Sequence, residues 1–146
     1  MITADLGTIT VTGDGDVALT NSVDGNSVTA TAGLTLTTDE TVGADAGAVT
    51  LAAGTDLTLG AGGATASTDV ALTAGNVLTQ TGNIVTTEDI DLEATTGDII
   101  TTGTSAGRNF EADAANRVTL GGNVTSTGTF EIGQDIEPTG AITFNA

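Results

Sequence analysis

The chain alternates apolar and polar residues in short runs, and these runs return at a nearly fixed interval. From Val70 onward, the large apolar residue that opens each run recurs every 20 positions, and intervals of 19 and 21 residues extend the series towards the amino terminus. The seven apolar anchors are Ile9, Val28, Val49, Val70, Ile90, Phe110 and Phe130. A period of this length indicates one structural unit per repeat, stacked on its neighbours.

Each repeat contains three clusters of apolar residues. It opens with an alternation of period two, such as Val70, Leu72 and Ala74, which is typical of a β-strand with one buried face. A pair of apolar residues then follows: Val17/Leu19, Leu34/Leu36, Leu57/Leu59 and Val118/Leu120. A third inward position comes next: Val23, Val42, Ile84, Val124 and Phe144. The pattern predicts an all-β fold, a parallel and three-faced β-solenoid of about seven coils of roughly 20 residues.

Two details of this ladder give local expectations. Gly33, Gly54 and Gly75 follow the first strand of successive repeats, where the chain turns a corner that needs a positive φ or a close backbone approach. Phe110 is expected directly under Phe130, because equivalent residues of successive coils stack on one another. The alternative fold is a β-sandwich or barrel of hairpins, which a fixed interval over several repeats disfavours.

The composition excludes several classes of function. Two arginines stand against 19 acidic residues, with no lysine and no histidine, so the formal net charge is -17. Nucleic-acid binding depends on basic residues that neutralise phosphates, and we therefore predict no nucleic-acid partner. The apolar runs are too short to cross a bilayer, so we also predict no membrane insertion.

Candidate catalytic groups are few. The chain has no histidine, cysteine, tyrosine or lysine, so the usual general bases and nucleophiles are missing. The carboxylate pairs Asp14/Asp16 and Asp89/Asp91 are of the kind that cleaves glycosides, but the only aromatic residues are three phenylalanines. The sequence therefore predicts a protein that is not an enzyme and has no resident cofactor, calcium apart.

One row of residues is a candidate metal site. The outward position one residue after each anchor is occupied in turn by Thr10, Thr29, Thr50, Ala71, Asp91, Glu111 and Glu131. Asp91, Glu111 and Glu131 are expected on adjacent rungs about 4.8 Å apart, where like charges repel. Bound Ca²⁺ would offset that repulsion through carboxylate ligands. Two alternatives stay open: an ion pair of Arg108 with Glu88 or with the acidic rungs, and a solvated acidic face.

The first half of the same row is threonine. Residues 8–12 read TITVT and residues 35–38 read TLTT, and ranked threonines of this kind form the flat face of ice-binding solenoids. The row is interrupted at Ala71 and becomes acidic after it. Ice binding is therefore the weakest of the binding hypotheses, and threonine otherwise serves as a β-former with a polar outer side.

The repeats also resemble a known family. Residues 70–85 (VALTAGNVLTQTGNIV) and residues 90–100 (IDLEATTGDII) are similar to the repeat region of filamentous-haemagglutinin-type exoproteins and related bacterial surface adhesins. The likeness extends from about Ile9 to Phe144. It implies a right-handed parallel β-helix, an extracellular or bacterial cell-surface location, and a stalk, filament or adhesin role without catalytic residues.

These observations lead to two hypotheses of function. The first is a non-enzymatic structural shaft or filament module: residues 1–146 form a single β-solenoid domain that is a fragment or subunit of a longer repeat array. Its partners are then neighbouring coils of a parent chain, or other copies bound end to end, because no capping element is evident before Ile9 or after Phe144. The second is an adhesin-like module whose acidic, threonine-rich face binds a glycan, a mineral or Ca²⁺.

Overall fold

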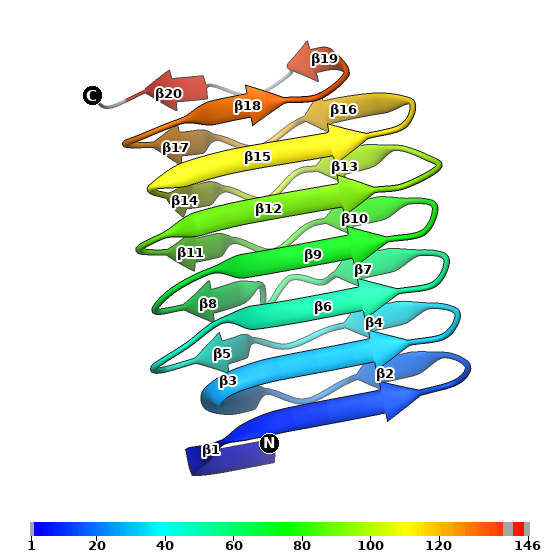
Figure 1. Ribbon diagram of the computed structural model, residues 1–146, viewed down its shortest axis with the longest axis vertical. Helices are drawn as coiled ribbons and strands as arrows, with labels where there is room; N and C mark the ends of the chain where they lie inside the picture. Colours follow the sequence, from blue (N-terminus) through cyan, green and yellow to red (C-terminus); the bar gives the residue numbers. More distant parts are fainter. Residues whose placement is uncertain (1, 139–141, 145–146) are drawn as a thin grey trace.

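The computed structural model describes residues 2–138 and 142–144. The chain forms an all-β parallel solenoid of about six turns, each of roughly 20 residues. Figure 1 shows it crossing the front from left to right and returning behind as it climbs from blue to red, which makes the solenoid right-handed. The expected fold is confirmed, and the coil count agrees roughly, because seven anchors enclose six complete intervals.

The strands lie on three faces, which we call the long, second and third faces. The long face carries β1 (Ile2–Gly13), β3 (Val23–Ala32), β6 (Val49–Ala53), β9 (Val70–Ala74), β12 (Asp89–Ala94), β15 (Asn109–Ala114) and β18 (Phe130–Ile132). The second face carries β2 (Val17–Leu19), β4 (Leu36–Thr38), β7 (Leu57–Leu59), β10 (Leu78–Gln80), β13 (Ile99–Thr101), β16 (Arg117–Leu120) and β19 (Asp135–Pro138). The third face carries β5 (Val42–Ala44), β8 (Ala64–Ala66), β11 (Ile84–Thr86), β14 (Ser105–Gly107), β17 (Val124–Ser126) and β20 (Ile142–Phe144). The first residues of β3 also belong to the third face, since Val23 pairs with Val42 of β5.

The anchors stack in one column, as the period predicts. Val70 pairs with Ile90, and Phe110 pairs with Phe130, in strands that are parallel throughout. The rings of Phe110 and Phe130 stack with their centroids 5.3 Å apart and their planes 13° from parallel. Alternating side chains of the three faces meet inside to form one continuous apolar core. Because side chains alternate between the two faces of a strand, every second residue points inward. Each inward position then forms one buried column through successive coils.

The second face differs from the sequence pattern in one coil. The predicted inward pair Leu34/Leu36 is wrong, because Leu36 and Thr38 point inward while Leu34 is 50% exposed. Leu36 pairs with Val17 below and with Leu57 above, so its register is set by neighbouring coils. Local alternation could not separate Leu34 from Leu36, since both are leucines two residues apart.

The third face follows the prediction more closely. The expected inward residues Val23, Val42, Ile84 and Val124 are all buried. Phe144 lies in β20, and its side chain is outside the described part of the structure. In other coils the same inward column is filled by Ala64 and Ser105, which apolar periodicity alone did not pick out.

Stacked glycines let successive coils approach each other closely at two corners of the solenoid, although Thr95 and Ala115 take the place of glycine at the first corner in later coils. A Cβ atom on Gly54 or Gly75 would lie about 2 Å from the carbonyl oxygen of the glycine one turn below. The close approach predicted for Gly33, Gly54 and Gly75 is confirmed, whereas a positive φ occurs among the described glycines only at Gly63. A second set of stacked glycines, which we call the glycine column, lies at another corner: Gly60, Gly82, Gly103 and Gly122.

Polar side chains interrupt the core in the middle of the stack. Gln80 and Ser105 are fully buried and hydrogen-bonded to each other. Thr101 stands directly above Gln80 in the neighbouring strand and is also buried. Its Oγ1 has no hydrogen-bond partner among the described residues. A buried hydroxyl in that state destabilises the fold by the loss of its hydration.

Replacing Thr101 by valine is therefore expected to stabilise the protein. The valine keeps the shape of the side chain and removes the unpaired hydroxyl, which should raise the free energy of unfolding by about 1 kcal/mol. Urea unfolding followed by circular dichroism measures the change. The matched control is Thr58→Val on the outward side of β7, which should stay within about 0.5 kcal/mol. A lower unfolding midpoint for Thr101→Val would show that the hydroxyl is satisfied in solution.

Candidate functional site

The carboxylates singled out in the sequence lie side by side on the long face. Asp91 of β12 pairs with Glu111 of β15, which in turn pairs with Glu131 of β18. We call these three residues the acidic ladder. A second outward column two residues further along adds Glu93 beside Asp113. All five side chains are exposed, and successive rungs of a sheet are about 4.8 Å apart, so the carboxylates repel one another.

Desolvation and, after it, this repulsion change the acidity of the ladder. Desolvation by the neighbouring side chains, and secondly the charge of Asp113, raise the pKa of Asp91 above its ordinary value of 3.8. Desolvation, followed by the charges of Asp91, Glu131 and Asp113, raises the pKa of Glu111 above its ordinary value of 4.5. Both shifts mean that the folded protein holds these protons more tightly than the unfolded chain does.

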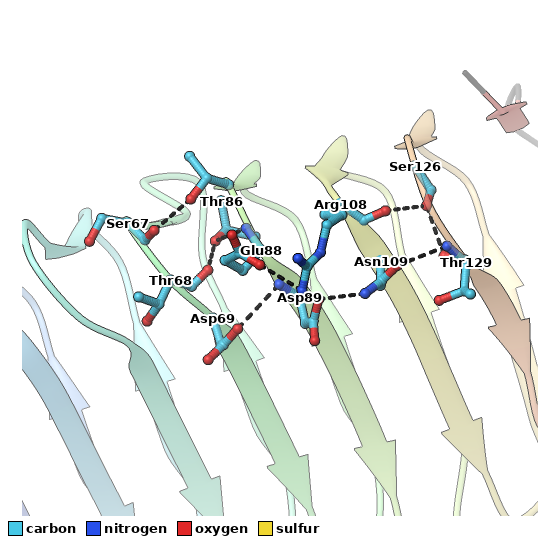
Figure 2. A network of polar contacts seen from close by, with 11 residues as sticks. Ser67, Thr68, Asp69, Thr86, Glu88, Asp89, Arg108, Asn109, Ser126 and Thr129 are labelled. Atoms are coloured by element: carbon cyan, nitrogen blue, oxygen red, sulfur yellow. Dashed lines mark hydrogen bonds and ion pairs between the residues drawn. The ribbon is translucent and has the colours of Figure 1, made fainter. Parts of the chain in front are cut away.

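The nearest arginine does not neutralise the ladder. The Arg108 guanidinium forms an ion pair with Glu88 at 2.6 Å and lies 3.4 Å from Asp89, at the corner before β15 (Figure 2). Of the alternatives left open by the sequence, the pair with Glu88 is confirmed. About half of the Arg108 side chain remains exposed, so this is an ordinary surface ion pair with a small effect on stability.

A chain of hydrogen bonds runs from coil to coil along the edge of the long face (Figure 2). The Asp69 carboxylate accepts from the Asp89 backbone N–H at 3.2 Å, and the Asp89 carboxylate accepts from Asn109 Nδ2 at 2.7 Å. Asn109 Oδ1 in turn accepts from the Thr129 backbone N–H at 2.8 Å. We call these four residues the edge column. The sequence analysis missed it, although a polar residue directly before each of these anchors was the available signal.

The edge column and the acidic ladder enclose a shallow groove of about 340 Å³. Ala71 lines it at the end where the ladder stops, and the carboxylates of Asp69 and Asp89 face it from the edge column. Polar and apolar surface line the groove in nearly equal parts, and the polar part includes carboxylate oxygens, which are ligands that Ca²⁺ takes. Within residues 2–138 and 142–144, however, no three His, Cys, Asp or Glu side chains converge closely enough to hold a metal ion. The calcium site at Asp91, Glu111 and Glu131 stays a prediction.

The other half of the long face carries hydroxyl groups. Thr10, Thr29 and Thr50 stand on successive rungs, and the row ends at Ala71, as the sequence indicates. The long face thus has two halves of different chemistry: threonine on the early coils and carboxylate on the later ones. An array interrupted in this way gives ice binding no further support.

The remaining carboxylates of interest have structural partners. Asp16 accepts hydrogen bonds from the Thr35 hydroxyl at 2.7 Å and from the Thr35 backbone N–H at 3.1 Å. These two bonds lower the pKa of Asp16 below its ordinary value of 3.8. Asp89 is held by Asn109 in the edge column. Both contacts join one coil to the next, which is a role in stability.

Comparison with protein-family models, with curated proteins and with solved structures finds no match. Among the described residues there is also no helix long and apolar enough to cross a membrane.

The acidic ladder predicts that stability rises on mild acidification. Desolvation, and secondly the repulsion between carboxylates, disfavours the charged forms of Asp91 and Glu111 in the folded state but not in the unfolded chain. As the pH falls through their raised folded-state pKa values, the folded protein takes up protons first and the repulsion is relieved. The urea midpoint should therefore be higher at about pH 5 than at about pH 7. The Asp16 carboxylate has the opposite effect on stability, but only near and below pH 3.8, where protonation removes the charge that its lowered pKa shows to be stabilising.

Glu111→Gln is the matched variant for this effect. It should unfold at a higher urea concentration than the parent at neutral pH and gain less on acidification, because the central charge of the ladder is absent. A midpoint that falls steadily between neutral pH and about pH 5 in the parent would contradict the prediction.

Proposed function

We propose that this chain is a non-enzymatic structural module, a stiff β-solenoid shaft. The observation that carries the proposal is the unbroken stack. From β1 to β18 each strand of the long face pairs with its equivalent one turn on, and no inserted loop or subdomain interrupts the series. In a solenoid of this kind each coil contacts only the coils before and after it, so the stack extends along one axis. Such a stack can hold whatever is attached to its two ends at a fixed distance.

The setting we propose for this shaft is the bacterial cell surface or the extracellular space. The support is the resemblance of residues 70–85 and 90–100 to haemagglutinin-type repeats, together with the net charge of -17. Strong like charge keeps such surfaces soluble and apart. Partners of the module are then adjoining coils of a longer chain, or further copies that pair with the strand edges at the ends of the stack.

Immunolabelling of the producing cells tests this proposal. Antibodies raised against the purified chain should label intact cells, and mild protease treatment of intact cells should remove the label. Labelling that appears only after the cells are permeabilised would overturn the surface setting. Electron microscopy of the purified chain is the companion measurement: fibres whose axial repeat is about 4.8 Å would support assembly through the strand edges.

A second candidate is an adhesin-like module that binds a cation, and through it a mineral or glycan, at the acidic ladder. The observation that favours it is the groove, along which Asp91, Glu111 and Glu131 stand on successive rungs while Arg108 pairs elsewhere. Bound Ca²⁺ would supply the missing positive charge and add stability that rises with the free Ca²⁺ concentration.

Thermal unfolding with and without calcium tests the second candidate. Millimolar CaCl₂ should raise the Tm of the parent chain well beyond NaCl of equal ionic strength, which controls for screening. Glu111→Gln should lose most of that difference. An equal shift in the parent and in Glu111→Gln, or no shift beyond NaCl, would eliminate the ladder as a calcium site and leave the shaft proposal untouched.

A further inference from the structure

The coils of this solenoid are similar enough to be exchanged for one another. The first inward position of the second face is Leu57, Leu78, Ile99 and Val118 on successive coils, so a coil stacked on the wrong neighbour still buries aliphatic against aliphatic. Apolar contacts alone therefore discriminate weakly between the native order and an order in which one coil is looped out. Repeat proteins misassemble in this way.

One contact inside the stack is not interchangeable. Gln80 is 0% exposed, and its Nε2 donates to the carbonyl oxygens of Gly82 at 3.0 Å and of Thr104 at 3.2 Å. Ser105 Oγ lies 3.3 Å from Gln80 Oε1 and can donate its proton there. Every polar atom of the Gln80 amide is then satisfied. Gln80 belongs to the fourth coil (residues 70–89), whereas Thr104 and Ser105 belong to the fifth (residues 90–109).

The pairing is possible only between these two coils of the described structure. The residues equivalent to Ser105 in the other coils have no hydroxyl: Val23, Val42, Ala64, Ile84 and Val124. The residues equivalent to Gln80 are Leu19, Thr38, Leu59, Thr101 and Leu120, and none of them carries an amide. If the sixth coil took the place of the fifth, Gln80 Oε1 would face Val124 and would be buried without a donor.

We propose that the Gln80–Ser105 pair is a register lock, which joins the fourth coil to the fifth and rejects every other neighbour. Its contribution is specificity, since a buried amide without its partner is strongly unfavourable while an apolar pair in its place is not. A single buried polar pair has the same effect in a coiled coil, where it selects register at some expense of stability. The lock lies near the middle of the stack, between β10 and β14.

Engineered cysteines report the register directly, because the chain has no cysteine of its own. Thr79 pairs with Ile100, and Ile100 pairs with Thr119, all on the outward side of the second face. The T79C/I100C pair spans one rung and is the positive control for cross-linking. The T79C/T119C pair spans two rungs, about 9.6 Å, which is beyond the reach of a disulfide. It can cross-link only when the fifth coil has been skipped.

The test is to refold T79C/T119C from urea in the parent background and in the Q80L/S105V background, and then oxidise. We expect about tenfold more cross-link in Q80L/S105V, the factor that corresponds to one unsatisfied buried group. The control background is L78V/I84V, which removes packing from the same coil and leaves the polar pair intact; it should stay at the parent level.

A cross-link that remains at the parent level in Q80L/S105V would overturn the proposal. An equal rise in L78V/I84V would also overturn it, because the effect would then be general loosening of the stack. Should Q80L/S105V fail to fold by circular dichroism, S105A alone carries the test. It removes the hydroxyl that accepts from Gln80 Nε2 and donates to Gln80 Oε1, and the same cross-link should still rise above the parent level.

Discussion

Replacing Phe110 by alanine is expected to lower the free energy of unfolding by about 3–5 kcal/mol, the range for a buried phenylalanine. Phe110 is 1% exposed and fills the core between the long face and the two others. Its ring also stacks on Phe130, 5.3 Å away between centroids, and that contact would be lost with it. Ala112, the next inward residue of β15, is too small to fill the space that the ring leaves.

The measurement is urea unfolding followed by circular dichroism, with Phe130→Ala as the matched control. Phe130 is only partly buried, so its truncation removes the same atoms with a smaller loss of buried surface. The expected order is therefore a larger loss for Phe110→Ala than for Phe130→Ala. Equal losses would mean that β18 packs as tightly as β15, and a loss below about 1 kcal/mol at Phe110 would contradict the buried stack.

The second large effect is expected at the glycine column. A Cβ atom on Gly103 would lie 2.0 Å from the Gly82 carbonyl oxygen and 2.6 Å from its carbon. Both neighbours are backbone, so neither can rotate away, and the rungs would have to separate. Gly103 has no positive φ, which means that the penalty for alanine is steric. We expect Gly103→Ala to lower the free energy of unfolding by about 3 kcal/mol, the upper range for overpacking.

Gly15→Ala is the control for this prediction. A Cβ atom at Gly15 would meet nothing within 4 Å, and the residue also lacks a positive φ. Its substitution should change the free energy of unfolding by less than about 0.5 kcal/mol, or stabilise slightly by restricting the unfolded chain. If Gly103→Ala and Gly15→Ala unfolded at the same urea concentration, the close approach of the corners would not hold in solution.

The candidate site could be predicted in part. The positions of Asp91, Glu111 and Glu131 on adjacent rungs followed directly from the repeat, and so did the end of the threonine row at Ala71. The groove beside them did not, because its other wall is the edge column. That wall depends on side chains such as Asn109 reaching across to the next coil, which spacing along the chain does not reveal.

The sequence by itself determined the architecture, for a physical reason. In a parallel stack, equivalent residues of successive repeats pair with one another, so a 20-residue period is also a map of the sheet register. Only the tertiary structure decided which polar residues enter the core. Leu34 is exposed, Thr38 is buried, and Gln80 hydrogen-bonds to Ser105. These positions are determined by contacts between coils and not by the alternation of apolar and polar residues within one coil.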